Sequence, residues 1–544
     1  MGILTLGLIC IILGLCLARY SRRTKHPLPP GPKPWPLIGN VLDMPTIRPW
    51  EKYAEWCKEY RSDLVFLQLP MQPVIIVGSF TACIDLFEKR SQLYSDRISS
   101  VLFNMMGCDY HFSIMRYTPW WRAHRRKFHQ HFHSTVVPMY QPVQLQQTRM
   151  FLSWIVKSPE NSRKLIRQLI TAVIFKITYG KQITSMDDEY VTLAQIGVEG
   201  IGEACIPGAY FVDLLPILRY IPSWVPGTAA KKLAEKYRPY VMGTRDKPYD
   251  EVKKAVENGT ASPSWAATLV EEIRTNFGNT EAEEFNELIA RNVAGVAYAA
   301  GADTTSSSSL SLLLAMAMFP EVQKKAQAEL DRVVGPDRLP DFEDVERIPY
   351  IKAIVMETLR WMPVAPFAIP HAVLTDDVYE GYHIPKGSLL IPNVWAMFRN
   401  PDDYPEPEQF KPERFIGKDG NINPDVLDPI NVAFGFGRRQ VSSLILLRYF
   451  VPVLVYCALF RLCPGRHLAV NTLCIYAAST LYAFDITPGV DADGNPVVLS
   501  NEQLGALITM PRTVPCGLTP RTETTVCLIQ EAVAEYDYVS ESPE

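Results

Sequence analysis

The chain lacks an excess of positive charge. Its 54 lysines and arginines are outnumbered by 58 aspartates and glutamates, which gives a formal net charge of -4 over 544 residues. A protein that binds nucleic acid usually carries a basic field or a basic stripe. We therefore do not expect nucleic acid among the partners of this protein.

The sequence lacks the cysteine spacings that are typical of disulfide frameworks and zinc sites. The 11 cysteines are scattered along the chain, without the dense spacing of a disulfide framework, a C-x-x-C pair or a zinc-like group with histidine. The sequence thus predicts reduced thiols in a reducing compartment. One of these cysteines is a candidate metal ligand because of the motif around it.

No internal repeat and no glycine–serine linker divides residues 45–518, which we interpret as one catalytic domain. The stretch from Glu283 to Phe319 is apolar around most of its circumference and predicts a long helix buried through the middle of the fold. Short runs such as "DLVFLQL", "PVIIVG" and "GYHIPKGSLLIPN" predict a small peripheral sheet. The expected fold class is mainly α with a small β-sheet region.

The two ends of the chain differ in composition from this domain. An uncharged apolar segment from Gly2 to Ala18, followed by basic residues, predicts one N-terminal transmembrane helix in residues 1–25. We favour this retained anchor over a signal peptide, because the charges follow the apolar run and no A-x-A-like cleavage site is present. Prolines make residues 26–44 a stiff hinge. Residues 519–544 form an acidic tail that we expect to be peripheral or disordered.

Residues 434–469 contain two short motifs, "FGFGRR" and "CPGRHLA", separated by an apolar run. A cysteine that ligates haem iron is a thiolate, so its sulfur needs backbone N–H donors and a loop held close to the ring. The two motifs together resemble the cysteine loop of the cytochrome P-450 family, and the resemblance extends over nearly the whole chain. The family pattern Phe-x-x-Gly-x-Arg-x-Cys-x-Gly falls on Phe434, Gly437, Arg439, Cys463 and Gly465.

The resemblance implies a P-450 fold that holds haem b, with Cys463 as the axial thiolate ligand and Arg439 in contact with a propionate. In "PWWRAHRRKF", Trp121 and Arg125 match the Trp-x-x-x-Arg motif of the family, in which both residues contact a propionate. His371, after "APFAIP", resembles a further propionate contact. The competing interpretations are a buried structural cysteine and a solvated basic helix face beside a buried tryptophan.

Glu357 and Arg360 in "IVMETLRWMP" lie three residues apart on one helix face, where they can form an ion pair. The family pairs them with the arginine of "KPERF", here Arg414. The resemblance therefore implies a structural triad that braces the core on the side of the cysteine loop.

The long helix carries "AGADTT" at its centre, and a buried acid and hydroxyl are costly there unless they are used. By resemblance, Asp303 and Thr304 are catalytic and deliver protons to dioxygen, while Gly301 leaves room for the oxygen and for a local helix distortion. The alternative, a helix whose hydroxyls bond its own carbonyls, fits Ser306 to Ser309 better than it fits Asp303.

The resemblance implies a haem-thiolate monooxygenase, similar to fungal secondary-metabolism members, that inserts one oxygen atom from dioxygen into an apolar small molecule. The microsomal type implies electrons from an NADPH-cytochrome reductase, with cytochrome b5 as a further candidate partner, and a single-pass protein of the endoplasmic reticulum membrane whose catalytic domain is cytosolic. Substrate contacts are expected from Ser99–Phe112, Tyr298, Ala302, Val364–Phe367 and Leu504–Thr509. A haem-thiolate isomerase or dehydratase is an alternative, against which the intact Asp303–Thr304 pair argues.

The sequence departs from the family in one place. The family has one residue between the arginine and the cysteine of the loop, whereas residues 440–462 lie between them here. A membrane span is excluded, because both ends must converge at the haem. A genuine insertion, an isoform that retains non-coding sequence and an error in the gene model remain, and we favour a non-coding origin. A catalytically impaired product is therefore a second alternative.

Overall fold

Helices form most of the fold. The computed structural model describes residues 25–437 and 462–541, apart from 71, 206–209, 214, 226, 492 and 506, and it describes 537–541 by their backbone alone. The longer helices are α2 (Pro49–Tyr60), α6 (Pro119–Phe132), α7 (Gln141–Lys157), α8 (Ser162–Tyr179), α9 (Glu189–Ala204), α10 (Ala229–Glu257), α11 (Trp265–Phe277), α12 (Ala282–Met318), α13 (Pro320–Val334), α15 (Pro349–Trp361), α18 (Arg466–Ala483) and α19 (Glu523–Glu541). The shorter ones are α3 (Phe80–Cys83), α4 (Ser91–Tyr94), α5 (Val101–Met106), α14 (Phe342–Arg347), α16 (Val394–Met397) and α17 (Ile430–Ala433).

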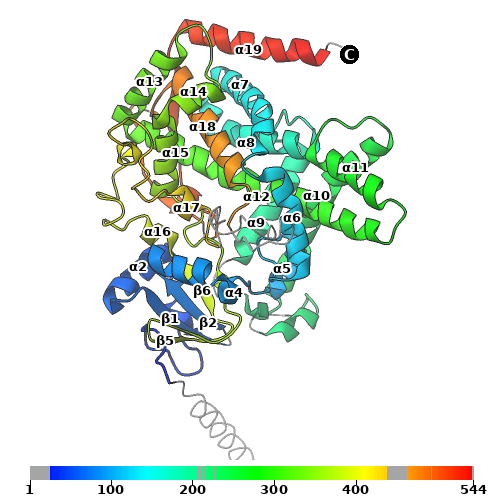
Figure 1. Cartoon of the computed structure of the whole chain (residues 1–544), viewed down its shortest axis with the longest axis vertical. Coiled ribbons are helices and arrows are strands. Elements are labelled where there is room, and N and C mark those ends of the chain that lie inside the picture. Colours follow the sequence, from blue (N-terminus) through cyan, green and yellow to red (C-terminus); the bar gives the residue numbers. More distant parts are fainter. Residues whose placement is uncertain are drawn as a thin grey trace, which may run out of the picture.

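The strands are short and lie mostly at one end of the molecule, below the helices in Figure 1. The largest sheet has the order β1-β2-β6-β3, with β2 and β6 parallel and the other neighbours antiparallel. Its strands are β1 (Leu64–Leu69), β2 (Gln72–Val77), β6 (Leu389–Pro392) and β3 (His371–Ala372). Three antiparallel pairs are β4 (Asp377–Tyr379) with β5 (Tyr382–Ile384), β7 (Phe484–Pro488) with β10 (Cys516–Pro520), and β8 (Gln503–Leu504) with β9 (Met510–Pro511). The prediction of a mainly α fold with small sheets is confirmed.

Helix α12 crosses the middle of the molecule (Figure 1), within one residue of its predicted bounds at each end. Its flanks are buried, as Val293 and Leu310 show. At the centre, however, Ala300 is exposed and Gly301 and Thr304 are half-buried. Beyond its exposed N-terminal turns, the helix therefore offers an accessible turn at the centre of its buried length.

The serines that follow this turn use their hydroxyls locally. Ser306, Ser308 and Ser309 donate to helix carbonyls four residues back, whereas Ser307 donates to the carbonyl of Thr509 at 2.6 Å. Such bonds satisfy buried hydroxyls without a ligand. The serine run is thus a packing feature, as the local-bonding interpretation predicts.

The proline-rich segment 26–44 lies against the domain. The carbonyl of Pro30 accepts from the Phe66 N–H of β1 at 2.8 Å, and that of Pro27 accepts from the His383 N–H at 2.7 Å. The side-chain carbonyl of Asn40 accepts from the Gln68 N–H at 2.8 Å. These bonds fasten the segment along the sheet, so it does more than space the domain from what precedes it.

The acidic C-terminal segment forms a helix at the periphery of the molecule, so the peripheral alternative fits and disorder does not. Helix α19 packs against α7, with Ile529 fully buried and Arg149 of α7 donating to the Tyr536 hydroxyl at 3.0 Å. Its inward residues recur at helical spacing, which acidic composition alone conceals. Figure 1 shows α19 at the end of the molecule opposite the sheet.

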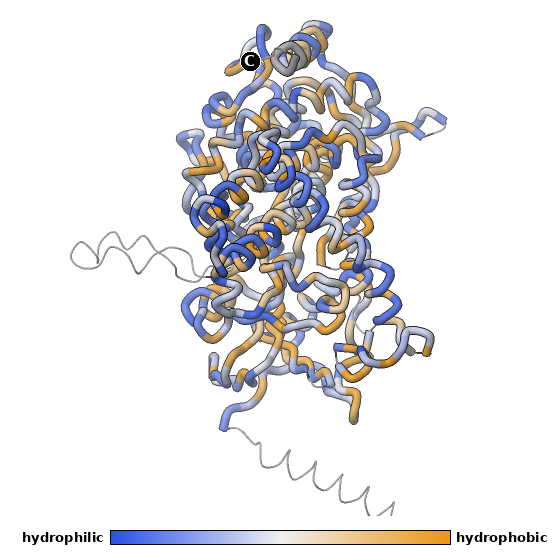
Figure 2. Tube along the Cα trace, turned by 90° about the vertical axis from the view of Figure 1, so that its right-hand side faces the viewer, coloured by the Kyte–Doolittle hydropathy of each residue, from blue (hydrophilic) through white to orange (hydrophobic). Residues whose placement is uncertain are grey.

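The predicted N-terminal anchor lies outside the described residues. Within residues 25–437 and 462–541, no helix combines the length and the apolar character needed to cross a bilayer. Hydrophobic and hydrophilic positions alternate at short intervals along the described tube (Figure 2). This distribution is typical of helices around a shared core.

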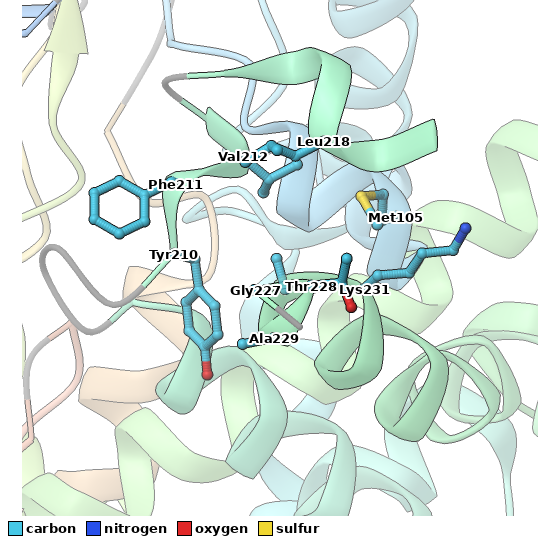
Figure 3. A pocket seen from close by; sticks show the side chains of 10 residues that line it. Met105, Tyr210, Phe211, Val212, Leu218, Gly227, Thr228, Ala229 and Lys231 are labelled. Carbon is cyan, nitrogen blue, oxygen red and sulfur yellow. The ribbon is translucent and has the colours of Figure 1, made fainter. Parts of the chain in front are cut away.

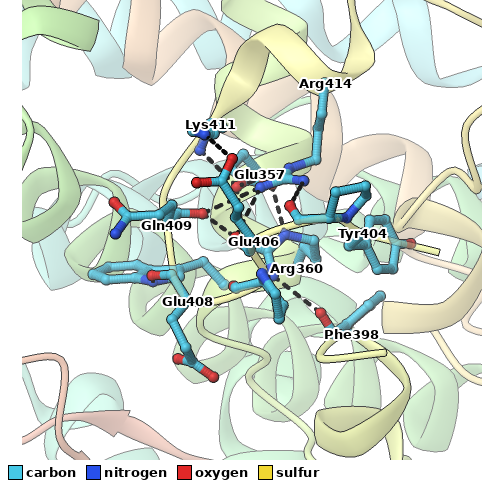
Figure 4. Close-up of polar contacts among 12 residues, drawn as sticks. Glu357, Arg360, Phe398, Tyr404, Glu406, Glu408, Gln409, Lys411 and Arg414 are labelled. Carbon is cyan, nitrogen blue, oxygen red and sulfur yellow. Dashed lines mark hydrogen bonds and ion pairs between the residues drawn. The ribbon is translucent and has the colours of Figure 1, made fainter. Parts of the chain in front are cut away.

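A buried ion-pair network ties α15 to the segment around "KPERF" (Figure 4). Arg360 donates from Nε and Nη2 to the two carboxylate oxygens of Glu357 at 2.7 and 2.8 Å, and both side chains are fully buried. Nε of Arg414 lies 3.3 Å from Glu357 Oε1, and the Lys411 N–H donates to the same oxygen at 2.7 Å. The remaining N–H groups of Arg360 donate to the carbonyls of Phe398, Pro407 and Gln409. The structure thus brings the three residues of the expected triad together.

We expect Glu357→Gln to lower the free energy of unfolding by about 3 to 5 kcal/mol, because it leaves a buried guanidinium without its counter-ion. Urea unfolding followed by circular dichroism measures the change. The matched control is Glu55→Gln, since Glu55 forms an exposed pair with Lys52 at the same three-residue spacing. That change should cost less than about 1 kcal/mol, and equal losses in the two variants would contradict a bracing role for the network.

Candidate active site

The two halves of the cysteine motif meet in space. The Cys463 N–H donates to the carbonyl of Phe434 at 3.0 Å, across the residues that separate them in sequence. Gly437 has φ = 148°, a backbone conformation that favours glycine, and Gly465 is the N-cap of α18. Arg439 and residues 440–461 lie outside the described residues, so the propionate contact expected of Arg439 stays a prediction.

The sulfur of Cys463 lies in surroundings that partly suit an anion. Burial raises the pKa of the thiol, while the Gly465 and Arg466 N–H groups and the charges of Arg125 and Arg466 act in the opposite direction. Coordination by a metal ion deprotonates a thiol outright. The loop therefore fits a thiolate whose charge is shared between these donors and a metal.

Arg125 reaches the cysteine loop from α6, whose N-terminus Thr118 caps by accepting from the Trp121 N–H. Nη2 of Arg125 donates to the carbonyl of Leu462 at 2.6 Å, and burial lowers the pKa of Arg125 to about 10. Nε of Arg125 is buried and has no hydrogen-bond partner among the described residues. A buried N–H left unpaired is costly, and a carboxylate such as a haem propionate would satisfy it. The side chains present therefore fit a haem.

Trp121 and His371, the other two expected propionate contacts, both have a protein partner in the structure. The indole N–H of Trp121 donates to the carbonyl of Phe112 at 2.9 Å. Nδ1 of the buried His371 lies 2.7 Å from the carbonyl of Tyr94, which can only accept. A carboxylate at Nε2 of His371 would thus require the doubly protonated ring. Both propionate contacts stay predictions.

Arg97 is a buried arginine beside β3 that the sequence interpretation missed. Its Nη1 donates to the carbonyls of Ile369 and Pro370, next to His371, and the neighbouring Asp96 carbonyl accepts from the Ala372 N–H at 2.8 Å. A guanidinium is rarely buried unless its charge is used. No spacing in the sequence marks this position, because the contacts join segments that are far apart in the chain.

The accessible turn of α12 carries the expected catalytic pair. The Thr304 hydroxyl donates to the carbonyl of Ala300 at 2.9 Å. Asp303 is buried, and its Oδ1 accepts from Nη2 of Arg167 on α8 at 2.9 Å. Arg167, together with residues including Arg163 and Lys164, lines a pocket of about 400 Å³. In the sequence, Arg167 stands out as an arginine within the mostly apolar stretch "KLIRQLI". That feature could have identified it as the partner of a buried acid such as Asp303.

Two residues near this turn make contacts that the sequence did not predict. A Cβ on Gly301 would lie 2.7 Å from Cδ1 of Ile174, so this glycine allows α8 to pack closely, and the room expected for oxygen stays a prediction. Tyr298, expected in the substrate pocket, is buried against Phe175, and its hydroxyl donates to the carbonyl of Tyr190 at 3.2 Å. Helical rotation places Tyr298 on the side of α12 that faces α8 and α9.

A small cavity lies between α5 and the start of α10 (Figure 3). Its volume is about 30 Å³, and Met105, Tyr210, Phe211, Val212 and Leu218 are among its lining residues. Substrate sites usually measure about 300 to 1,000 Å³, and 30 Å³ is the share of one water in the liquid. Met105 belongs to the segment expected to contact substrate, but this cavity is too small to hold an organic molecule of moderate size.

Comparison with known proteins agrees with this arrangement. Residues 29–440 match the family model for cytochrome P-450, and the match ends where the additional residues begin. The chain is similar to cytochrome P-450 monooxygenase ple1 of Rhodocybe pseudopiperita, with 38% identity over 502 residues, 92% of this chain and 91% of that protein. It is also similar to tryptamine 4-monooxygenase of Psilocybe cyanescens, with 34% identity over 524 residues, 95% and 98% of the two chains.

A third relative is cytochrome P-450 monooxygenase COX2 of Coprinopsis cinerea, with 38% identity over 506 residues, 93% of this chain and 91% of that one. All three are monooxygenases by name and extend over almost the whole chain. The chain therefore belongs to the cytochrome P-450 family, whose members are haem-thiolate monooxygenases and hence oxidoreductases.

Proposed function

We propose that this protein takes electrons from an NADPH-dependent reductase and inserts one oxygen atom of dioxygen into an apolar small molecule. The observation that carries the proposal is the closed cysteine loop, in which the Cys463 N–H reaches the Phe434 carbonyl at 3.0 Å despite the additional residues. When bound, the haem supplies the activation of dioxygen, and the thiolate ligand favours cleavage of its O–O bond.

The residues around this loop support the way in which the haem is held. Cys463 would ligate the iron, and Arg125 would bring its unpaired Nε to a propionate. Trp121, His371 and Arg439 are the further propionate contacts that the family pattern assigns. The accessible turn of α12 at Ala300 carries the residues that would serve the reaction with dioxygen.

Proton delivery would begin at Asp303. Oδ1 of Asp303 is held by Nη2 of Arg167 at 2.9 Å, so its use in proton delivery would require Arg167 to release the carboxylate. The pocket of about 400 Å³ that Arg167 lines gives that side chain room to move. Thr304, one residue further along α12, would then orient the proton toward the reacting oxygen through its hydroxyl.

The substrate class is proposed from relatives and from composition. Tryptamine 4-monooxygenase acts, by its name, on an aromatic amine. The segments expected to contact substrate, Ser99–Phe112 and Val364–Phe367, are mostly apolar. An aromatic or terpenoid intermediate of fungal secondary metabolism fits both observations.

We also propose attachment to the endoplasmic reticulum membrane, with the catalytic domain in the cytosol. Beyond the apolar N-terminal sequence, two described segments expose large apolar side chains, among them Leu37, Ile47, Ile217 and Trp224. The segment before α2 and the segment between α9 and α10 both lie toward the lower end in Figure 1. Exposed apolar patches of this kind are typical of surfaces that meet lipid or protein.

A carbon monoxide difference spectrum of the reduced protein tests the haem-thiolate proposal. We expect Cys463→Ala to abolish the band that gives the family its name, because the thiolate ligand is lost. Cys474→Ala is the matched control, since Cys474 is also a cysteine of the α18 region, but it is buried in the core. A band that survives Cys463→Ala would show that another group ligates the iron.

Replacing Thr304 tests the proton route. We expect Thr304→Ala to oxidise reduced cofactor while releasing peroxide in place of hydroxylated product, so product formed per cofactor oxidised falls by about tenfold or more. Ser308→Ala is the control, because Ser308 lies one turn further along and donates to the carbonyl of Thr304 in the same manner. Equal coupling in the two variants would reduce Thr304 to a helix-packing role.

Deleting Val441 to Leu462 leaves Gln440 as the single residue between Arg439 and Cys463, which is the family spacing. We expect more soluble haem-loaded protein and faster reductase-supported turnover, because an apolar run next to the cysteine loop favours aggregation and would obstruct a reductase that docks there. Peroxide-driven turnover, which needs no reductase, should change less. If the full-length protein matches or exceeds the deleted form in the reductase-driven rate, the insertion is a functional element and the proposed non-coding origin is wrong.

A further inference from the structure

His124 is a fully buried histidine on α6 that the site described so far does not use. Its side chain has no exposed surface, and its ring lies edge-on to Trp120 with centroids 4.4 Å apart. Nδ1 is 2.9 Å from the carbonyl of Trp120, and Nε2 is 3.0 Å from Nδ2 of Asn292 on α12. The ring therefore bridges the helix that carries Arg125 and the helix that carries Thr304.

The direction of each hydrogen bond follows from its partners. A backbone carbonyl can only accept, so Nδ1 of His124 carries the proton and donates to Trp120. A guanidinium can only donate, and Nη1 of Arg245 on α10 lies 3.4 Å from Oδ1 of Asn292. The amide of Asn292 therefore turns its Nδ2 toward His124, whose Nε2 accepts. The chain of donors from Arg245 to Trp120 is continuous, with a neutral histidine at its centre.

Other charges around this chain are paired with each other. Arg245 also donates to both carboxylate oxygens of Asp246, at 2.7 and 3.1 Å, and Arg291 lies 3.5 Å from Asp246. Burial lowers the pKa of His124 to about 4, in agreement with the neutral ring. The hydrogen bond between α6 and α12 is thus present throughout the neutral pH range.

This bond lies one residue away from the contact between α6 and the cysteine loop. Arg125 follows His124 directly, and its Nη2 donates to the carbonyl of Leu462, the residue before Cys463. Adjacent helical residues differ by about 100° in direction, so fixing His124 against α12 also fixes the direction in which Arg125 points. We infer that His124, through its hydrogen bond to Asn292, is a positioning residue that holds α6 at the rotation and depth at which Arg125 meets the cysteine loop.

The functional meaning of this inference rests on the proposed haem-thiolate chemistry, but its first test does not need haem. Hydrogen–deuterium exchange followed by mass spectrometry reports the protection of the peptide that contains Cys463, whose N–H is bonded to Phe434. We expect His124→Phe and Asn292→Leu each to speed exchange in this peptide roughly tenfold, the size of effect that one lost buried hydrogen bond can have. Combining the two changes should add little, because both remove the same bond.

A second readout uses the haem-loaded protein. The two variants should transfer haem to excess apomyoglobin roughly tenfold faster than the unsubstituted protein, because Arg125 no longer holds its place beside the loop. His124→Gln keeps a polar group able to meet Asn292 and should restore most of the protection and the haem retention. If His124→Phe does not fold, Asn292→Leu, which leaves α6 unaltered, decides the question.

Gln327→Leu is the control for general loss of stability. Gln327 is buried on α13 and donates to Asp485 at 3.0 Å, in a network that does not include α6. We expect it to lower the unfolding midpoint without changing exchange in the Cys463 peptide. Unchanged exchange in His124→Phe and Asn292→Leu, or an equal change in Gln327→Leu, would overturn the inference. Absence of the carbon monoxide band in the unsubstituted protein would instead overturn the proposed function, and the exchange data would still decide the role of His124.

Discussion

A thiolate at Cys463 has to exist in a place from which much of the water has been removed, and the arrangement of the site follows from that constraint. Burial alone raises the pKa of the thiol, so the anion must be compensated. The protein supplies backbone N–H groups at the start of α18 and the positive charge of Arg125. A metal ion supplies the rest when bound. Arg125 is itself half-buried, and its buried Nε has no hydrogen-bond partner among the described residues, so a propionate would supply the anionic partner.

The same balance of charges recurs on α12. A carboxylate in the middle of a buried helix is costly, and Arg167 on α8 compensates Asp303 at 2.9 Å. The ion pair ties Asp303 to α8, so proton delivery through this side chain would require Arg167 to move. The Thr304 hydroxyl is meanwhile held by the Ala300 carbonyl. In this structure both polar side chains are therefore hydrogen-bonded within the protein. Proton transfer through them would require the bonds to Arg167 and to the Ala300 carbonyl to break.

Sequence alone was sufficient where a pattern is local. The periodicity of α12 predicted its bounds within one residue, and the short β-like runs "DLVFLQL" and "PVIIVG" predicted β1 and β2. Contacts between distant segments were not predictable in this way. Arg167 is 136 residues from Asp303 in sequence, and nothing in its own segment identifies its partner.

The surroundings of single residues have the same origin. The close approach of Ile174 on another helix gives Gly301 a packing role that its own segment does not reveal. The family resemblance places Tyr298 in the substrate pocket, yet helical rotation turns it toward Tyr190. The C-terminal segment looked acidic by composition, whereas its packing depends on the spacing of its few apolar residues against α7. Each case depends on which neighbour the fold brings near.

The additional residues before Cys463 raise the question of whether a longer connection prevents the cysteine loop from closing. The entropy lost on closing a loop grows slowly, by about 0.6 kcal/mol for each doubling of its length, so a longer connection does not by itself prevent the cysteine loop from closing. The contact between Cys463 and Phe434 joins the two sides of the insertion. Arg125 on α6 holds the last residue of the insertion, Leu462. Cys463 is thus fixed by contacts at and across the end of the insertion, and not by the length of chain between the two motifs.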